Sequence, residues 1–326
     1  MLTKIALPIT FILIWSSGYL VGTIGVHAGP PLALIAWRFL VALTVITLIS
    51  LATRAPWPTR PRTYLHLLIT GALLQTVQLG CVYLGLAAGV PAGLSSVILG
   101  ASPLLVAALG AALLGEHLAR RQWIGLLIGL LGVVISLSPQ LTAGHQQLTG
   151  YLFTGIALIG FAAGTLYQKR FGQTVDLRTG TTVQLLGATL TSFPLAALHG
   201  GLHLPLNTAA LGSLAWLGTI NSIGAFIVLF TLLRTRTSAA ATSLLYLVPP
   251  VTALLAVPLL HQPLTSAVLI GMAISGIGVL LAVNPTRTAH PTSDTSDCSP
   301  PPPAAPDPSP RCSSATSSTS HDPATS

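Results

Sequence analysis

The chain consists of long apolar stretches separated by short clusters of charged residues. No Asp, Glu, Lys or Arg occurs between Arg62 and Glu116, and the same holds between residues 121 and 169, 178 and 234, and 236 and 287. Each stretch is long enough for two membrane-spanning helices of about 20 residues and the turn between them. The N-terminal stretch, interrupted by a single arginine, has room for two more. The pattern predicts an all-α membrane protein of ten transmembrane helices.

The first half of the chain maps onto the second at one fixed offset of 146 residues. Without a gap, the offset pairs Pro103 with Pro249, Gly18 with Gly164, Gly125 with Gly271, and Gly132 with Gly278. A unit of five helices ends on the opposite side of the membrane from its start, so the second copy is expected to be inverted. The first span also has an internal counterpart, which argues against a cleaved signal peptide.

We therefore expect three segments. Residues 1–139 form the first five-helix repeat, residues 140–285 form the second, and residues 286–326 form a disordered tail rich in Pro, Ser and Thr. Inverted repeats are a recurrent plan of secondary transporters, whose substrate site lies near the membrane midplane. The repeat is the main sequence argument for transport of a small molecule.

Composition and charge agree with this interpretation. Hydrophobic residues make up 52% of the chain and charged residues 6%, against about 25% charged residues in a typical soluble domain. Thirteen of the fourteen Lys and Arg residues lie at the N-terminus, in alternate loops or in the tail. The positive-inside rule then makes both termini cytoplasmic, in the inner or plasma membrane. Because the basic residues never gather on one element, a nucleic-acid partner is not expected.

Several motifs resemble the EamA-like branch of the drug/metabolite transporter superfamily. The resemblance covers residues 4–284 and departs at His261-Gln262, where the family commonly carries Gly-Glu. It implies the ten-helix fold and metabolite transport, with export favoured over uptake. The residues that carry it are Trp15-Ser-Ser-Gly-Tyr19, Trp37-Arg38-Phe39, Tyr83-Leu84-Gly85-Leu86, Ser102-Pro103-Leu104, Leu114-Gly115-Glu116-His117-Leu118 and Leu247-Val248-Pro249-Pro250.

Arg38 is the only charged residue inside a predicted span. An arginine near the bilayer centre costs about 2.5–3.5 kcal/mol on insertion scales, so it should face the interior or reach towards the interface. One interpretation is a cationic anchor for a carboxylate or phosphate of the substrate. The other is a structural arginine that reaches the outer interface or bonds to loop carbonyls.

Other polar and aromatic residues recur at helical spacing in the predicted spans. They either line a polar cavity together with Arg38 or serve as interhelical hydrogen bonds and packing. Pro103, Pro249 and Pro250 occupy equivalent mid-span places and are either hinges beside a cavity or simple kinks. The candidate substrate-binding residues besides Arg38 are Trp15, Tyr19, Gln75, Gln78, Ser95, Ser102, Gln184, Asn221 and Tyr246.

Two further sets of residues have a simpler interpretation. Glycine and serine stripes in the fifth and tenth spans predict close helix packing rather than substrate contacts. The cysteines lack metal-ligand spacing, and His199 and His203, although four residues apart as a metal pair could be, have no nearby carboxylate or cysteine. No nucleotide-binding loop is present either, so no metal or cofactor is expected. The stripes are Gly125, Gly129 and Gly132, and Gly271, Ser275 and Gly278.

The sequence thus predicts a permease, driven by a gradient or by secondary coupling, that moves a small polar metabolite by alternating access. An amino acid or organic acid is the expected substrate class, membrane lipids are expected partners, and a homodimer is left open. Uptake, or a non-transporting scaffold or receptor, are the alternatives. An enzyme is not expected, because no His, Asp or Glu constellation lies at membrane depth.

Overall fold

The computed structural model describes residues 2–115, 119–138, 145–171, 175–225, 228, 245 and 247–283. Every regular element in these ranges is a helix. A helix satisfies its backbone hydrogen-bonding groups internally, which is what an apolar environment requires. Tyr246, Glu116 and the predicted tail lie outside the described residues.

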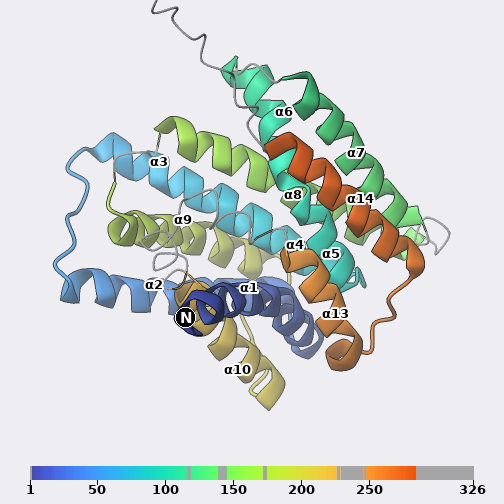
Figure 1. Ribbon diagram of the computed structural model, residues 1–326. Coiled ribbons are helices and arrows are strands. Elements are labelled where there is room, and N and C mark those ends of the chain that lie inside the picture. The colour runs from blue at the N-terminus through green and yellow to red at the C-terminus, as the bar shows by residue number, and fades with distance from the viewer. Residues whose placement is uncertain are drawn as a thin grey trace, which may run out of the picture. The chain divides into compact units, whose positions relative to one another are not determined.

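The helices follow one another in the order of the predicted spans (Figure 1). Two π-helical segments, η1 (Ala72–Val77) and η3 (Trp216–Gly224), continue α3 and α10. The α-helices are α1 (Leu2–Ala28), α2 (Pro31–Ala52), α3 (Pro61–Gly71), α4 (Gln78–Ala87), α5 (Ala92–Gly100), α6 (Ser102–Leu114), α7 (Arg120–Leu137), α8 (His145–Phe171), α9 (Leu177–Leu198), α10 (Thr208–Ala215), α13 (Val248–Leu260) and α14 (Ser266–Val283).

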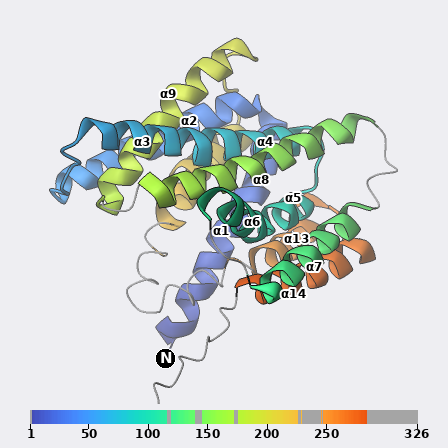
Figure 2. The same ribbon diagram turned by 90° about the horizontal axis from the view of Figure 1, so that it is seen from above.

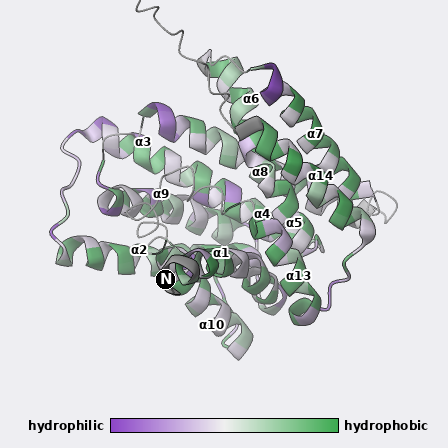
Figure 3. Ribbon diagram, viewed as in Figure 1, coloured by the Kyte–Doolittle hydropathy of each residue, from purple (hydrophilic) through white to green (hydrophobic). Residues whose placement is uncertain are grey.

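Seven helical stretches of the described chain are long and apolar enough to cross a membrane. They comprise α1, α2, the continuous α3–η1–α4, α5 with α6, α7, α8 and α9, while α13 and α14 are apolar but shorter. Hydrophobic residues cover most of the helices, and hydrophilic ones gather near the start of α3 and at the start of α7 (Figure 3). The full count of ten spans stays a prediction.

The helix boundaries repeat at the offset found in the sequence. Three pairs, α2 with α9, α6 with α13, and α7 with α14, begin and end 146 residues apart. Ala101 before α6 and Leu247 before α13 have nearly the same φ and ψ angles, −80° and 0° against −86° and −11°. Gly115 and His261, which follow these helices, are both left-handed. The two halves therefore share backbone conformation as well as sequence pattern.

Helices α7 and α14 lie side by side (Figures 1 and 2), and their small residues face each other. Gly132 lies against the backbone of Gly271 and Ser275, and Gly278 lies against Gly129. Residue numbers that increase along one helix pair with residue numbers that decrease along the other, so the two helices are antiparallel. The glycine and serine stripes form a packing surface, as predicted.

Helices α2 and α9 form a second antiparallel pair. Near the start of α2, Trp37 packs edge-on against Phe193 near the end of α9, with ring centroids 5.4 Å apart. Near the end of α2, the hydroxyl of Ser50 lies 3.2 Å from that of Thr182 near the start of α9. Antiparallel contact between equivalent helices is the arrangement that an inverted repeat requires.

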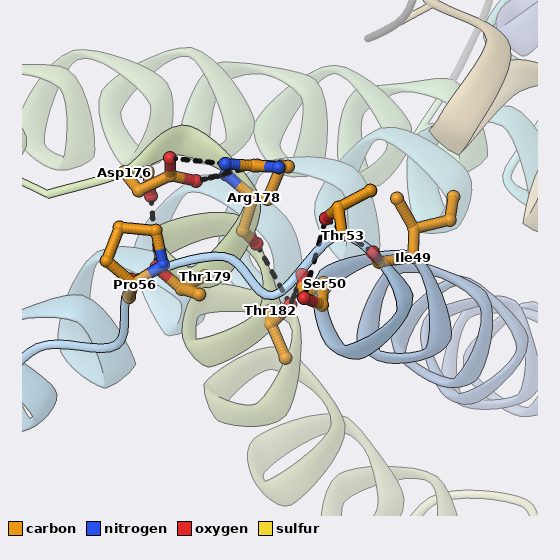
Figure 4. A network of polar contacts seen from close by, with 8 residues as sticks. All are labelled: Ile49, Ser50, Thr53, Pro56, Asp176, Arg178, Thr179 and Thr182. Atoms are coloured by element: carbon orange, nitrogen blue, oxygen red, sulfur yellow. Dashed lines mark hydrogen bonds and ion pairs between the residues drawn. The ribbon is translucent and has the colours of Figure 1, made fainter.

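The start of α9 is fixed to the chain after α2 by a polar network (Figure 4). Asp176 caps α9 by accepting the backbone N–H of Arg178 at 2.9 Å, and its carboxylate pairs with the guanidinium of the same arginine at 2.9 Å. Thr179 donates to the carbonyl of Pro56 at 2.8 Å. The side-chain hydrogen bond from Arg178 is the main cause that lowers the pKa of Asp176 below its ordinary 3.8.

Close packing of α7 on α14 predicts opposite effects of two alanine substitutions on α14. Gly278→Ala places a methyl group against the backbone of Gly129 and should destabilise the protein by about 1–3 kcal/mol. Gly276→Ala meets no atom within 4 Å and should be neutral or slightly stabilising. The melting temperatures of the purified variants in detergent measure this difference. Equal melting temperatures would contradict the described packing.

The lowered pKa of Asp176 predicts a pH-dependent contribution to stability. Its carboxylate stabilises the folded protein above about pH 4, and this contribution disappears as the pH falls through the lowered pKa. Asp176→Asn keeps a capping acceptor but loses the charge. Because the pair is partly exposed, the variant should melt at most about 2 °C below wild type at pH 7. The gap should close as the pH falls through the lowered pKa, and a gap that persists once the carboxyl is protonated would refute a charge effect.

Candidate functional site

Arg38 lies in the first half of α2, with 5% of its surface exposed. Its Nη1 donates to the hydroxyl of Tyr83 on α4 at 2.6 Å, and its Nη2 donates to Oδ1 of Asn221 on η3 at 2.7 Å. A longer bond of 3.3 Å runs from Nε to the hydroxyl of Ser222. Among the described residues the guanidinium bonds to no backbone carbonyl, and side chains from α4 and η3 hold it inside the protein.

Two of these partners connect Arg38 to the backbone of α1. The hydroxyl of Tyr83 donates to the carbonyl of Gly18 at 3.3 Å, and Nδ2 of Asn221 donates to the carbonyl of Ile14 at 2.8 Å. A Cβ at Gly18 would meet the Asn221 side chain, and one at Gly22 would meet the Tyr83 ring. These two glycines bring α1 close enough to join the cluster.

The π-helical conformation of η3 explains how two consecutive residues reach one guanidinium. A π-helix advances less per residue around its axis than an α-helix, because its hydrogen bonds run from i to i+5. The hydroxyl of Ser222 donates to the carbonyl of Leu217, five residues earlier, at 2.7 Å. Asn221 and Ser222 then face Arg38 together. π-Helical segments are frequent at functional sites.

The charge of Arg38 has no acidic partner in the part of the chain that the structure describes. Asp176 is the single carboxylate there, and it pairs with Arg178. The hydrogen bonds of Arg38 use three of the five N–H groups of a guanidinium, all with neutral acceptors. The cluster is thus a buried positive charge that, among the described residues, hydrogen-bonds to neutral acceptors alone.

The aromatic candidates on α1 belong to different hydrophobic clusters. Tyr19 packs against the main hydrophobic core, which includes Tyr83. Trp15 packs against Phe11 with ring centroids 5.4 Å apart and belongs to a separate hydrophobic cluster with Val251. Of these two candidates, Tyr19 is the one close to the arginine cluster.

The serine and proline candidates lie where the fourth span is interrupted. Helix α5 ends at Gly100 and α6 starts at Ser102, with Pro103 in the first turn of α6, where its missing N–H is not needed. Pro249 and Pro250 occupy the same place in α13. Ser95 on α5 is fully buried, and its hydroxyl has no hydrogen-bond partner. The same is true of Thr252 on α13, the helix that packs on α5.

The glutamine candidates lie away from Arg38. Gln75 is on η1, Gln78 begins α4, and Gln184 is on α9, and all three are half-buried. The backbone carbonyl of Gln184 lies directly against Gly71, at the point where α3 and α9 meet.

Sequence reasoning missed three residues of functional interest. Tyr83 and Ser222 complete the arginine cluster, and the only signal for Tyr83 was its place in a family motif. Gln262, noted as a lost acid, accepts the backbone N–H of Ala92 at 3.0 Å and so caps the start of α5. A neutral amide can make this hydrogen bond. Among the described residues, no group of three His, Cys, Asp or Glu could hold a metal ion.

These features define a multi-spanning helical membrane protein with two related halves and a buried cationic centre where helices of both halves meet. A model of the EamA-like transporter family matches residues 2–138 and again residues 148–284. The chain therefore belongs to the EamA-like transporter family.

Individual relatives agree with this assignment. The chain is 30% identical to the "Probable amino-acid metabolite efflux pump" of Salmonella typhimurium over 51% of this chain and 54% of the pump, so it spans about half the length of that relative. It is 28% identical to the "Uncharacterized inner membrane transporter YedA" of Escherichia coli, over 82% of this chain and 87% of YedA. A solved structure described as "Crystal structure of protein" gives a TM-score of 0.58 at 25% identity, over 85% of this chain and 96% of that one.

The arginine cluster predicts unequal effects of removing two tyrosine hydroxyls. Tyr83→Phe leaves a buried guanidinium N–H without its acceptor and should destabilise the protein by about 1–3 kcal/mol. Tyr151→Phe removes a buried hydroxyl that has no partner and should change stability little. Thermal unfolding of both variants in detergent checks this, and an equal effect would show that the Tyr83 hydroxyl does not hold Arg38.

Proposed function

We propose that this transporter exports a small metabolite bearing a carboxylate, of the amino-acid or organic-acid class, by alternating access of two inverted halves. Arg38 is the anchor for the carboxylate. The observation that carries this proposal is that the guanidinium of Arg38 is buried and that all its hydrogen-bond partners among the described residues are neutral. Membrane potential, an ion gradient or the concentration difference of the substrate supplies the free energy.

The chemistry of the guanidinium supports a carboxylate as its ligand. Its planar fork matches the two oxygens of a carboxylate, and the resulting charge-assisted hydrogen bonds are about twice as strong as neutral ones. Two N–H groups remain for such a ligand beside the three that bond to Tyr83, Asn221 and Ser222. An incoming anion also neutralises a charge whose burial in an apolar protein is costly.

The relatives support the substrate class and the direction. Two of them, from Salmonella typhimurium and Escherichia coli, carry the name "Probable amino-acid metabolite efflux pump". Amino acids and their metabolites bear the carboxylate that Arg38 would recognise. Export is therefore favoured over uptake for this chain.

Alternating access is supported by the relation between the halves. Equivalent helices contact each other in antiparallel pairs, as inverted repeats do. The break at Ala101 between α5 and α6, and the equivalent backbone of Leu247 before α13, are the proposed hinges, with Pro103, Pro249 and Pro250 beside them. The buried hydroxyls of Ser95 and Thr252 lack partners, and a second conformation that opens the α5–α13 contact would expose them to substrate.

The proposed substrate path passes between these helices from the cytoplasm, with ten spans and both termini cytoplasmic in the inner membrane. Asn221 positions Arg38, and Tyr19 lies beside it. Other proposed lining residues are Trp15, Gln75, Gln78, Ser95, Ser102, Gln184 and Tyr246.

The proposal predicts loss of export when the arginine is removed. Arg38→Ala should lower metabolite release at least about tenfold, because losing about 1.4 kcal/mol of binding corresponds to a factor of ten. Arg38→Lys, which keeps the charge but not the fork, should be intermediate. Mass spectrometry of amino acids and organic acids released by expressing bacteria measures this, at equal amounts of protein in the membrane.

Arg62→Ala, which removes an exposed arginine, is the matched control and should release metabolites as wild type does. Equal release by Arg38→Ala and wild type would refute the anchor. Accumulation inside the cells instead of release would replace export by uptake. No change of any metabolite, inside or outside, would refute transport of these substrate classes.

A further inference from the structure

The offset between the halves gives the arginine cluster an uncharged counterpart. Adding 146 to Arg38 gives Gln184, and subtracting 146 from Asn221 and Ser222 gives Gln75 and Thr76. All three counterparts are polar residues. The correspondence links glutamines that are far apart in the sequence and belong to different halves.

The counterparts lie on helices that contact each other. Arg38 lies on α2, which contacts the π-helical η3, and Gln184 lies on α9, which contacts the π-helical η1. Thr76 on η1 donates to the carbonyl of Ala188 on α9 at 3.0 Å and lies 2.7 Å from the hydroxyl of Thr191. The same elements therefore form a polar contact in both halves.

The helix that packs on the π-helical segment through a glycine has an equivalent in the other half as well. Gly18 on α1 makes room for the Asn221 side chain on η3. Its equivalent, Gly164 on α8, makes room for side chains of η1, those of Leu73 and Leu74. Each site thus lies among three elements, one π-helical and two α-helical.

The two sites lie towards opposite ends of the protein. Arg38 is the eighth residue of α2, Gln184 is the eighth residue of α9, and these two helices are antiparallel. In the proposed topology the arginine site is in the outer half of the membrane and the glutamine site is in the cytoplasmic half.

The glutamine side chains lack the hydrogen-bond partners that the side chain of Arg38 has among the described residues. The side chains of Gln75 and Gln184 are half-buried, and neither makes a hydrogen bond with another residue in the described ranges. Thr76 alone supplies the interhelical bond there. A half-buried amide at membrane depth needs hydrogen-bonding partners, and a ligand or water in a transport path can supply them.

We propose that Gln75 and Gln184, with Thr76, form a second substrate site in the cytoplasmic half of the path, an uncharged mirror of the arginine site. The inference rests on the proposed function, since it concerns the same substrate. An amide both donates and accepts, so this site binds carboxylate, ammonium and hydroxyl groups without selecting a charge. The substrate binds with low affinity at this site and with higher affinity at Arg38.

One test does not depend on the substrate. In a chain with Cys81, Cys298 and Cys312 changed to Ser, Gln75→Cys and Gln184→Cys are treated in inverted vesicles with methanethiosulfonate ethylsulfonate, an anionic, membrane-impermeant reagent. Thr189→Cys on α9 is the control, because the Thr189 hydroxyl bonds to its own helix. We expect the two glutamine positions to react at least about tenfold faster than position 189. Equal, slow reaction would overturn the site.

A second test measures metabolite release with Arg38 intact. Gln75→Leu and Gln184→Leu should each lower the initial rate of release at least about threefold, and Thr189→Val should not. Melting temperatures identify variants that are merely unstable, and Gln184→Asn, which keeps the amide, should keep part of the rate.

The outcomes separate this inference from the proposed function. If Arg38→Ala abolishes release while both leucine variants match wild type, the proposed function stands and the second site is overturned. If the leucine variants lose release and Arg38→Ala does not, the second site stands and the arginine anchor fails.

Discussion

A guanidinium carries a positive charge into the interior of this helical protein, and an apolar interior requires hydrogen-bond acceptors around such a charge. Tyr83, Asn221 and Ser222 supply them, and the first two pass the connection to backbone carbonyls of α1. Four elements from both halves are therefore fixed by one side chain. Close approach of α1 and the π-helical form of η3 both serve this arrangement.

Symmetry of the backbone contrasts with asymmetry of the chemistry. Helix boundaries, left-handed residues and π-helical segments recur at one offset. Charge does not recur, since the counterpart of Arg38 is Gln184. The ends of the α2–α9 pair differ likewise: Ser50 bonds to Thr182 at one end, whereas their equivalents, Ala196 and Ala36, are apolar and packed together. The two halves thus share a backbone arrangement but carry different chemistry at equivalent positions.

Patterns that depend on local sequence were sufficient to predict that the chain is helical and that glycines pack α7 on α14. Asn221 was among the predicted candidates, but its contact with Arg38 and the contacts of Tyr83 and Ser222 were not predictable, because they join distant helices. Ser222 lies in a π-helical segment, whose hydrogen-bond pattern leaves no clear sequence signal. The capping of α5 by Gln262 depends on tertiary contact in the same way.

The matching π-helical segments carry information about ancestry. Such a segment is an irregularity that a helix has no intrinsic reason to adopt, yet η1 and η3 occur at equivalent places. A common origin by gene duplication explains this most simply: the ancestral five-helix unit already contained the wide turn, and both copies inherited it. The single arginine then marks divergence after duplication, when one copy specialised for charge and the other kept or acquired a neutral amide.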